Sequence, residues 1–331
     1  MGETLLAIDV GGSTSRACLV DADGRCLGCG RNRGGNPAST DPEQAAAAII
    51  SAVEAAVADV GPAVADLALA LIALAGPRAH VAQGKLEAAF RAVGLRGPLV
   101  FAGDLLAMFA SVTAAEDGYC VVAGTGAGVV RIRAGAIERV ADASGWLLGD
   151  RGSGFWLGLE ATRAVAAELE GRGEATALTP GVLAAFNIPW PNADTRLGRP
   201  AALSLLIDAV YAHRPIELAR FAPLVVSHRG DAVAARLLAE AGRYLVADFA
   251  LAFDPALPGP IALGGGVISH LDGVSAGIAD VVRAAGQVAD IRPVADGSVG
   301  AIVLALRAAG HAVDEARFQT ITASVRARTS A

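Results

Sequence analysis

The sequence predicts an α/β protein made of two similar lobes that face a shared cleft. Three observations support this prediction. The chain has 331 residues, which is enough for two domains with substantial cores. A unit of three strands, a helix, a strand and a helix occurs twice, first from about residue 5 and again from about residue 119. In both units a glycine-rich turn, at residues 11–14 and 124–128, joins the first strand to the second.

In the first unit, short apolar runs separated by turn residues indicate the strands. The run 67–74 is apolar throughout, as in strands that are buried on both faces. Residues 44–57 are rich in alanine and follow a capping segment at 40–43, which predicts a helix. The expected strands cover residues 5–10, 16–20, 25–31, 67–74 and 98–102. The expected helices cover residues 44–57, 81–93 and 105–113.

The second unit repeats the opening hairpin and then becomes mostly helical. The Pro-, Gly- and Asn-rich segment 171–199 predicts a mobile insertion. The expected strands cover residues 119–123, 129–133, 136–140, 260–263 and 287–293. The expected helices cover residues 155–168, 201–212, 216–226, 231–253 and 299–309. We place an N-terminal lobe at 1–106 and a C-terminal lobe with a helical insertion at 107–297, and expect a C-terminal helix at about 298–325 to pack back on the N-terminal lobe.

Composition excludes several classes of protein. The net charge is −6 and there is no basic cluster, so we expect no nucleic-acid or membrane partner. The sequence enters its first strand without a basic leader, and its longest apolar stretch, 67–75, is too short to span a bilayer. Four cysteines are few enough to fit a reducing cytosol, and we expect a cytoplasmic protein. Cys26 and Cys29 have C-x-x-C spacing, but without a second pair this favours small apolar residues in a sheet, as for Cys18 and Cys120.

Both glycine-rich turns are suited to hold phosphate groups. Glycines let backbone N–H groups approach an anion, and the hydroxyls of Ser13, Thr14 and Thr125 add donors. Either turn alone fits a simple hairpin equally well. Two of them at equivalent places in a duplicated chain favour a nucleotide-phosphate role. Neither has the spacing of a P-loop or of a dinucleotide-binding fingerprint.

Two aspartates stand at strand ends beside these turns. Asp9 is placed to hold Mg2+, which would neutralise charge on the phosphates, although a residue that satisfies turn N–H groups is the simpler alternative. Asp104 is placed to act as a general base that accepts the proton of an attacking hydroxyl, and its alternative is a helix N-cap. The pair therefore predicts phosphoryl transfer.

Two further loops are candidates for ligand binding. Residues 144–156 set apolar anchors among glycines and lead into a helix, which fits either a ligand-binding loop or a capped helix start. Gly264, Gly265 and Gly266 close a strand, and they either admit an adenine ring or form a plain strand-to-helix turn.

These residues resemble the sugar kinase/Hsp70/actin superfamily. More narrowly they are similar to the BadF/BadG/BcrA/BcrD ATPase family, which contains N-acetylglucosamine and glucosamine kinases. The similarity runs from about residue 5 to about residue 306, with its most specific pieces at 9–16, 36–37, 104, 124–128 and 145–156. The resemblance implies two RNase-H-like lobes of the actin/hexokinase type, each with a five-stranded mixed sheet and helices, around a central cleft.

The resemblance also implies a role for each matching residue. Asp104 would activate the 6-hydroxyl of the sugar. The remaining assignments are ATP-phosphate binding by Gly11, Gly12, Ser13, Thr14, Gly124, Thr125 and Gly126, adenosine contact by Gly264, Gly265 and Gly266, sugar contact by Asn36, Gly145, Trp146 and Asp150, and Mg2+ at Asp9.

Four departures from the family pattern narrow the range of sugars that we expect as substrates. Thr14 replaces a common Lys or Arg, which leaves Arg16 as the nearest cation, and Gly128 replaces an Asn. The Gly-Trp segment is shortened to Ser-Gly-Trp at 144–146, and Arg151 replaces a Glu. These changes count against an acetamide-binding part of the pocket and leave the phosphoryl-transfer residues intact. Asp150 and Asp142 would favour a free amine, with a plain surface position for Asp142 as the alternative.

We therefore expect an ATP- and Mg2+-dependent kinase that phosphorylates the 6-hydroxyl of an amino sugar, with glucosamine preferred. An N-acetylglucosamine kinase is the alternative, and a non-sugar ATPase or activator of the same fold is a further one. Cys120 is the only cysteine of the second lobe, which disfavours the iron–sulfur activators of dehydratases. The absence of a zinc motif and of a preceding helix-turn-helix disfavours ROK proteins and transcription factors. A non-catalytic sensor would need no base. The alanine-rich helices fit a homodimer interface as well as an internal core.

Overall fold

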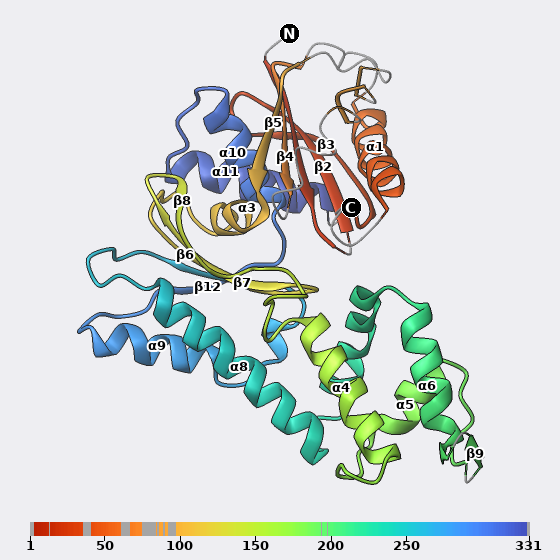
Figure 1. Cartoon of the computed structure of the whole chain (residues 1–331). Helices are drawn as coiled ribbons and strands as arrows, with labels where there is room; N and C mark the ends of the chain where they lie inside the picture. Colours follow the sequence, from red (N-terminus) through yellow and green to blue (C-terminus); the bar gives the residue numbers. More distant parts are fainter. Residues whose placement is uncertain are drawn as a thin grey trace.

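The computed structural model describes residues 3–12, 14–35, 41–60, 67–74, 84, 86–88, 90–91, 97–192, 194–196 and 198–329. Its first sheet has the strand order β3-β2-β1-β4-β5 (Figure 1). The strands are β1 (Thr4–Val10), β2 (Thr14–Asp21), β3 (Cys26–Arg33), β4 (Leu69–Leu74) and β5 (Leu99–Gly103). The first three strands form an antiparallel meander, and β4 and β5 run parallel to β1. All six residues of β4 are buried, as their continuous apolar character predicts.

The second sheet has the order β12-β11-β6-β7-β8, which is the same topology read from the other edge. Its strands are β6 (Gly118–Ala123), β7 (Ala127–Arg133), β8 (Ala136–Asp142), β11 (Ile261–Gly264) and β12 (Ile291–Pro293). An antiparallel meander again pairs with two parallel strands. The predicted α/β fold with two five-stranded mixed sheets is confirmed.

Helices cover both faces of the first sheet (Figure 1). Helix α1 (Pro42–Ala58) packs on one face and is capped by the Asp41 carboxylate, which accepts the N–H groups of Glu43 and Gln44. Helices α10 (Ser298–Ala308) and α11 (Glu315–Thr329) pack on the other face. Helix α10 matches the helix expected at 299–309. The segment expected as one helix at about 298–325 consists of two helices, because the chain turns between them and Gly310 adopts a φ of 87°. The helix expected at 81–93 lies largely outside the described residues.

The second lobe carries most of the remaining helices below its sheet (Figure 1). The segment 171–199, expected to be a mobile insertion, includes a helix whose Leu178, Val182 and Leu183 are fully buried in the core. The helix expected at 216–226 is a 3-10 turn followed by a short helix. The elements are α4 (Gly154–Leu169), α5 (Leu178–Ala185), β9 (Thr195–Arg196), β10 (Arg199–Pro200), α6 (Ala201–Ala212), η2 (Pro215–Phe221), α7 (Ala222–Ser227), α8 (Ala232–Ala252), η3 (Ile268–His270) and α9 (Val274–Ala284).

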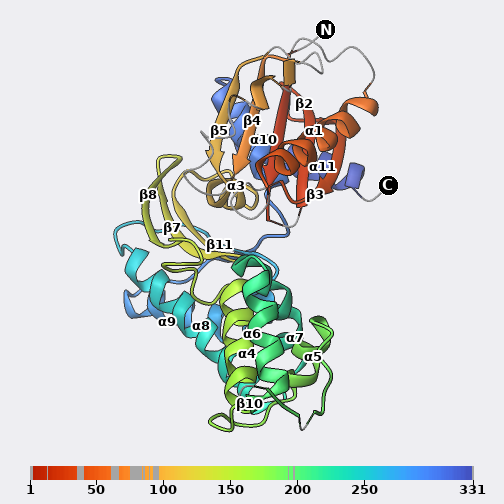
Figure 2. The same ribbon diagram turned by 45° about the vertical axis from the view of Figure 1, so that its right-hand side comes forward.

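Helix α3 (Asp104–Ala110) is shared by the two lobes and lies between their sheets (Figure 2). Its Ala107 and Ala110 pack in the first core together with α10, whereas Phe109 packs against the second sheet. Gly300 lets α10 approach α3, because a Cβ at this position would collide with the carbonyl oxygen of Ala107. None of the described helices is long and apolar enough to cross a bilayer.

Candidate active site

Asp9 lies at the end of β1, where the first glycine-rich turn begins. The N–H of Gly11 donates to the carbonyl of Thr14 at 2.9 Å and closes this hairpin. Antiparallel pairing places Arg16 of β2 opposite Asp9, and their side chains approach to 3.6 Å. The Asp9 carboxylate is buried and accepts the N–H of Gly297, at the start of α10, at 3.1 Å. Asp9 therefore joins the first hairpin to a segment 288 residues further along the chain.

The surroundings of Asp9 form a compact charged cluster. Arg16 also approaches Asp296 at 3.5 Å, so one guanidinium lies between two carboxylates. Burial raises the pKa of Asp9 to about 7, with a further rise from the charge of Asp296, while Arg16 and the Gly297 N–H lower it. A buried carboxylate held beside a second one is a hard oxygen donor set that fits a divalent cation such as Mg2+.

Asp104 is the first residue of α3, directly after β5. Gly103 is the N-cap of this helix, so the alternative interpretation of Asp104 as the cap is wrong. One Asp104 oxygen accepts the N–H of Leu105 at 2.8 Å. Burial raises the pKa of this carboxyl, and the N–H groups of Leu105 and of Asp104 itself lower it. The charge of Asp104 also raises the pKa of Asp9, because the structure brings the two strand-end aspartates near one another.

The second glycine-rich hairpin, residues 124–126, is held on both sides by neighbouring loops. The N–H of Gly124 donates to the carbonyl of Gly126 at 2.9 Å. The carbonyls of Gly124 and Thr125 accept N–H groups from Gly154 and Phe155, at the start of α4. A Cβ on Gly126 would lie 2.9 Å from the Asp150 carboxylate, so glycine is needed there. The N–H groups of Gly11 and Gly124 are therefore engaged within their own hairpins.

The glycine run after β11 packs against this hairpin. Gly265 has a φ of 98°, and a Cβ on it would collide with the carbonyl oxygen of Ala123. A Cβ on Gly264 would collide with Met108 of α3. Close packing thus explains two of the three glycines. A Cβ on Gly266 would meet no atom within 4 Å, which leaves open space beside the hairpin.

The loop that follows β8 is organised by Asp142. Its carboxylate, 4% exposed, accepts the N–H groups of Asp150 at 2.8 Å and Arg151 at 2.9 Å, so the surface alternative for this residue is wrong. Trp146 is half-buried and packs on the ring of Phe155, with 5.5 Å between ring centroids. Gly145 adopts a φ of 79°, a left-handed conformation that favours glycine.

Asp150 connects this loop to the second hairpin. It is buried and lies beside Gly126. Burial raises the pKa of Asp150 to about 6, the N–H groups of Ala127 and Gly145 lower it, and the charge of Asp142 raises it. Arg151 pairs with Asp248 at 3.2 Å, approaches Asp142 at 3.9 Å and lies over the ring of Tyr244 at 4.6 Å.

The sequence profile of the BadF/BadG/BcrA/BcrD ATPase family matches residues 6–305. The chain belongs to this family. No curated protein shows a significant sequence match. Among solved structures, a proposed N-acetylglucosamine kinase from Chromobacterium violaceum is 26% identical, with a TM-score of 0.71 over 92% of this chain and 99% of that one.

Two more distant structures share the fold. A proposed N-acetylglucosamine kinase from Porphyromonas gingivalis is 19% identical, with a TM-score of 0.64 over 91% of this chain and 97% of that one. A ROK family glucokinase from Streptomyces griseus, in complex with glucose and AMPPNP, is 22% identical, with a TM-score of 0.52 over 92% and 99%. The fold of this BadF/BadG/BcrA/BcrD family member is that of the actin- and hexokinase-like sugar kinases.

The structure gathers most of the predicted site residues around the starts of α3, α4 and α10. Ser13 and Asn36 lie outside the described residues. Asp296 and Gly297 were missed by sequence reasoning, although the Asp-Gly-Ser segment before a predicted helix resembles a helix start that follows a strand end.

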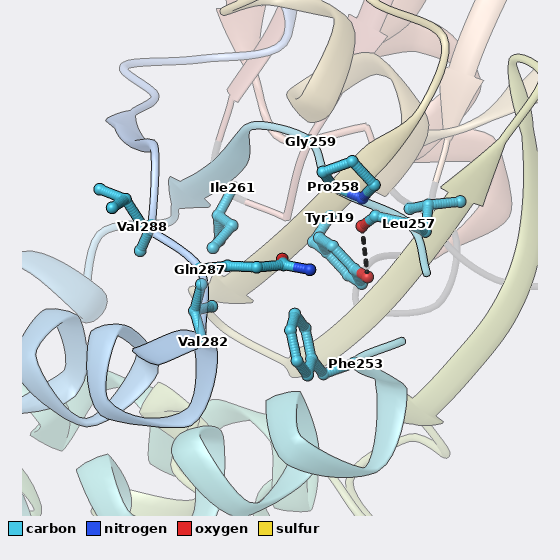
Figure 3. A pocket seen from close by; sticks show the side chains of 10 residues that line it. Tyr119, Phe253, Leu257, Pro258, Gly259, Ile261, Val282, Gln287 and Val288 are labelled. Atoms are coloured by element: carbon cyan, nitrogen blue, oxygen red, sulfur yellow. Dashed lines mark hydrogen bonds between the residues drawn. The ribbon is translucent and has the colours of Figure 1, made fainter. Parts of the chain in front are cut away.

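A separate pocket of about 270 Å3 lies at the opposite end of β6 and β11 from the hairpin (Figure 3). Its walls are mostly apolar. The Tyr119 hydroxyl donates to the carbonyl of Leu257 at 3.0 Å, and the Gln287 amide donates to the carbonyl of Pro255 at 2.6 Å. Because these polar groups already form hydrogen bonds within the protein, we do not consider this pocket the active site. The candidate active site remains the region around Asp9 and Asp104.

Proposed function

We propose that this protein is an ATP-dependent kinase that phosphorylates the 6-hydroxyl of an amino sugar, with glucosamine as the preferred substrate. The observation that carries the proposal is a pair of strand-end aspartates beside a glycine-rich hairpin: the buried Asp9 on β1 and the half-buried Asp104 directly after β5. Family membership and the similar sugar kinase structures support it.

In this proposal Asp104 is the general base. Its carboxylate accepts the proton of the sugar hydroxyl while that oxygen attacks the terminal phosphate, a contribution of about 10²–10⁴ in rate for such groups. The hydrogen bond from the Leu105 N–H fixes the orientation of one carboxylate oxygen and leaves the other for substrate. Burial raises the pKa of Asp104, which makes the ionised form a stronger base than an exposed aspartate.

Asp9 and Asp296 would hold Mg2+, which supplies positive charge beside the phosphates when it is bound. Arg16 occupies the space between these carboxylates and would shift toward the phosphates as the cation binds. The hydroxyls of Thr14 and Thr125 would bind the phosphate oxygens, together with the N–H groups of the two turns that do not close the hairpins. The open space at Gly266 is suited to the adenosine.

The sugar would lie against Gly145, Trp146 and Asp150. An ionised Asp150 favours the ammonium group of glucosamine, and the raised pKa of about 6 leaves it ionised at neutral pH. Arg151, where the family commonly has Glu, is paired with Asp248 and does not neutralise Asp150. N-acetylglucosamine is the second candidate, because the structure with 26% identity is a proposed N-acetylglucosamine kinase.

The experiment is a coupled ADP-release assay with Mg-ATP against glucosamine, N-acetylglucosamine, glucose and no sugar. We expect the highest kcat/KM with glucosamine. Preference for N-acetylglucosamine would keep the kinase and reject the role of Asp150 in selecting an amine. Equal ADP release with every sugar and with none would reject the sugar kinase in favour of an ATPase that acts on another partner.

A further inference from the structure

Three of the four cysteines lie together on one face of the first sheet. The Sγ atom of Cys29 lies 2.9 Å from that of Cys18 and 3.1 Å from that of Cys26. All three sulfurs lie within 4.8 Å of one another. Cys18 and Cys29 stand directly opposite each other in the antiparallel pair of β2 and β3. The interpretation of these residues as separate small apolar side chains misses this grouping.

A β-bulge is what brings the third sulfur into the group. In a regular strand, residues three apart point to opposite faces, so Cys26 and Cys29 would be separated by the sheet. Here Leu19 pairs with Gly28 but Val20 pairs with Cys26, so Leu27 is the extra residue of a bulge. Leu27 packs on the α1 side of the sheet, whereas Cys26 joins Cys18 and Cys29 on the side of α10 and α11.

Cys26 is buried, at 7% exposure, but it borders a groove that also holds positive charge. This residue lines a shallow surface groove beside α11, together with Arg25, Ser324 and Arg328. The Cys26 and Cys29 sulfurs share a hydrogen bond at 3.1 Å. Interactions with Cys18, Cys29 and the charge of Arg328 hold the pKa of the Cys26 thiol below its usual range, although burial raises it. Low-pKa cysteines with a cationic neighbour and a nearby second thiol are the ones that react with oxidants.

We propose that Cys26, Cys29 and Cys18 form a thiol–disulfide site, in which Cys26 reacts with a hydroperoxide and then forms a disulfide with Cys29. A structural zinc ion would need four ligands, and among the described residues only these three sulfurs converge. Two neighbouring arginines also favour thiolate chemistry over cation binding.

The proposed reaction is balanced. The Cys26 thiolate attacks one peroxide oxygen, the O–O bond breaks, and Cys26 becomes a sulfenic acid while the other oxygen leaves as water. The Cys29 sulfur then attacks the Cys26 sulfur, the S–O bond breaks, and a second water leaves. Two thiols are oxidised to one disulfide and hydrogen peroxide is reduced to two waters, which carry the two thiol protons.

The test treats the purified full-length protein with hydrogen peroxide and counts free thiols in denaturant with a chromogenic disulfide reagent. We expect the count to fall from four to two, and dithiothreitol to restore all four. Peptide mass mapping should find Cys26 joined to Cys29. A count that stays at four, a product that dithiothreitol does not reduce, or a disulfide that involves Cys120 or a second chain would each overturn the proposal.

Two variants sharpen the test. Cys26→Ser should lose no thiols over the period in which the wild type loses two. Cys120→Ser is the matched control, since Cys120 is buried in β6 away from the cluster, and its count should fall from three to one. Equal loss in Cys26→Ser would remove Cys26 from its role. One zinc ion retained per chain after purification, with thiols protected until a chelator is added, would replace the proposal with a metal site. If Cys26→Ser does not fold, the mass mapping of the wild type decides.

Discussion

Replacing Asp9 with Asn should abolish activity and yet stabilise the nucleotide-free protein, increasingly so as the pH rises. Burial raises the pKa of Asp9 from 3.8 to about 7 in the folded state. A carboxyl whose folded pKa is raised contributes its full stability below pH 3.8 and loses it progressively up to about pH 7, because folding then opposes ionisation. Each pKa unit is worth about 1.4 kcal/mol, so the loss reaches about 4 kcal/mol at pH 8.

Asn keeps an oxygen for the Gly297 N–H and cannot ionise, so Asp9→Asn escapes this loss. We expect the variant to exceed the wild type in unfolding free energy by about 1.5 kcal/mol at pH 5 and by about 4 kcal/mol at pH 8. The assay is urea denaturation followed by circular dichroism, with a chelator and without nucleotide. Asp23→Asn is the control, because Asp23 is an exposed carboxyl of the same lobe. A gap that does not widen between pH 5 and pH 8, or that widens equally for Asp23→Asn, would refute the reasoning.

Three further predictions concern the site and its supports. Asp104→Asn should lower kcat by about 10²–10⁴-fold while calorimetry still detects ATP binding. The acid limb of the wild-type kcat/KM profile, which the raised pKa of Asp104 moves to higher pH, should be absent from the residual activity, and near-normal turnover would end the base assignment. Asp142→Ala removes the acceptor of two loop N–H groups, so it should lower the free energy of unfolding by about 2 kcal/mol, measured by thermal denaturation, and raise the KM for sugar. An unchanged KM would show that this loop does not contribute to sugar binding. Gly300→Ala should force α3 and α10 apart, lower the free energy of unfolding by about 1–3 kcal/mol and lower kcat. Gly230→Ala is the control, because its Cβ would lie in open space, and it should change neither stability nor kcat; equal effects of the two variants would contradict the contact between the helices.

The features that could be predicted from the sequence are those marked by a short local pattern of residues. The two glycine-rich turns, the apolar strand β4 and the strand-end aspartates are local patterns, and the duplicated unit predicted the shared topology of the two sheets. The helix expected at 299–309 agrees with α10, but the separate helix α11 was missed, because the expected C-terminal helix was drawn through the turn at Gly310.

What sequence reasoning could not provide is contact between distant segments. The Gly297 N–H that binds Asp9 lies on an element that follows the whole second lobe, and no spacing rule connects the two. The cysteine cluster was hidden for a different reason. Period-two alternation separates Cys26 from Cys29, and only the bulge at Leu27, which depends on pairing with β2, turns both sulfurs to one face.

The two aspartates of the candidate site, Asp104 and Asp9, are linked through helices α3 and α10. Helix α3 begins at Asp104 and α10 begins directly after Gly297, which holds Asp9. The two helices touch at Gly300 and Ala107, where a side chain at position 300 would collide with backbone. Because α3 also packs against the second sheet, a rotation of one lobe relative to the other would act on α3 and so on the position of Asp104. The close contact between these helices therefore ties the geometry of the proposed base to the arrangement of the lobes.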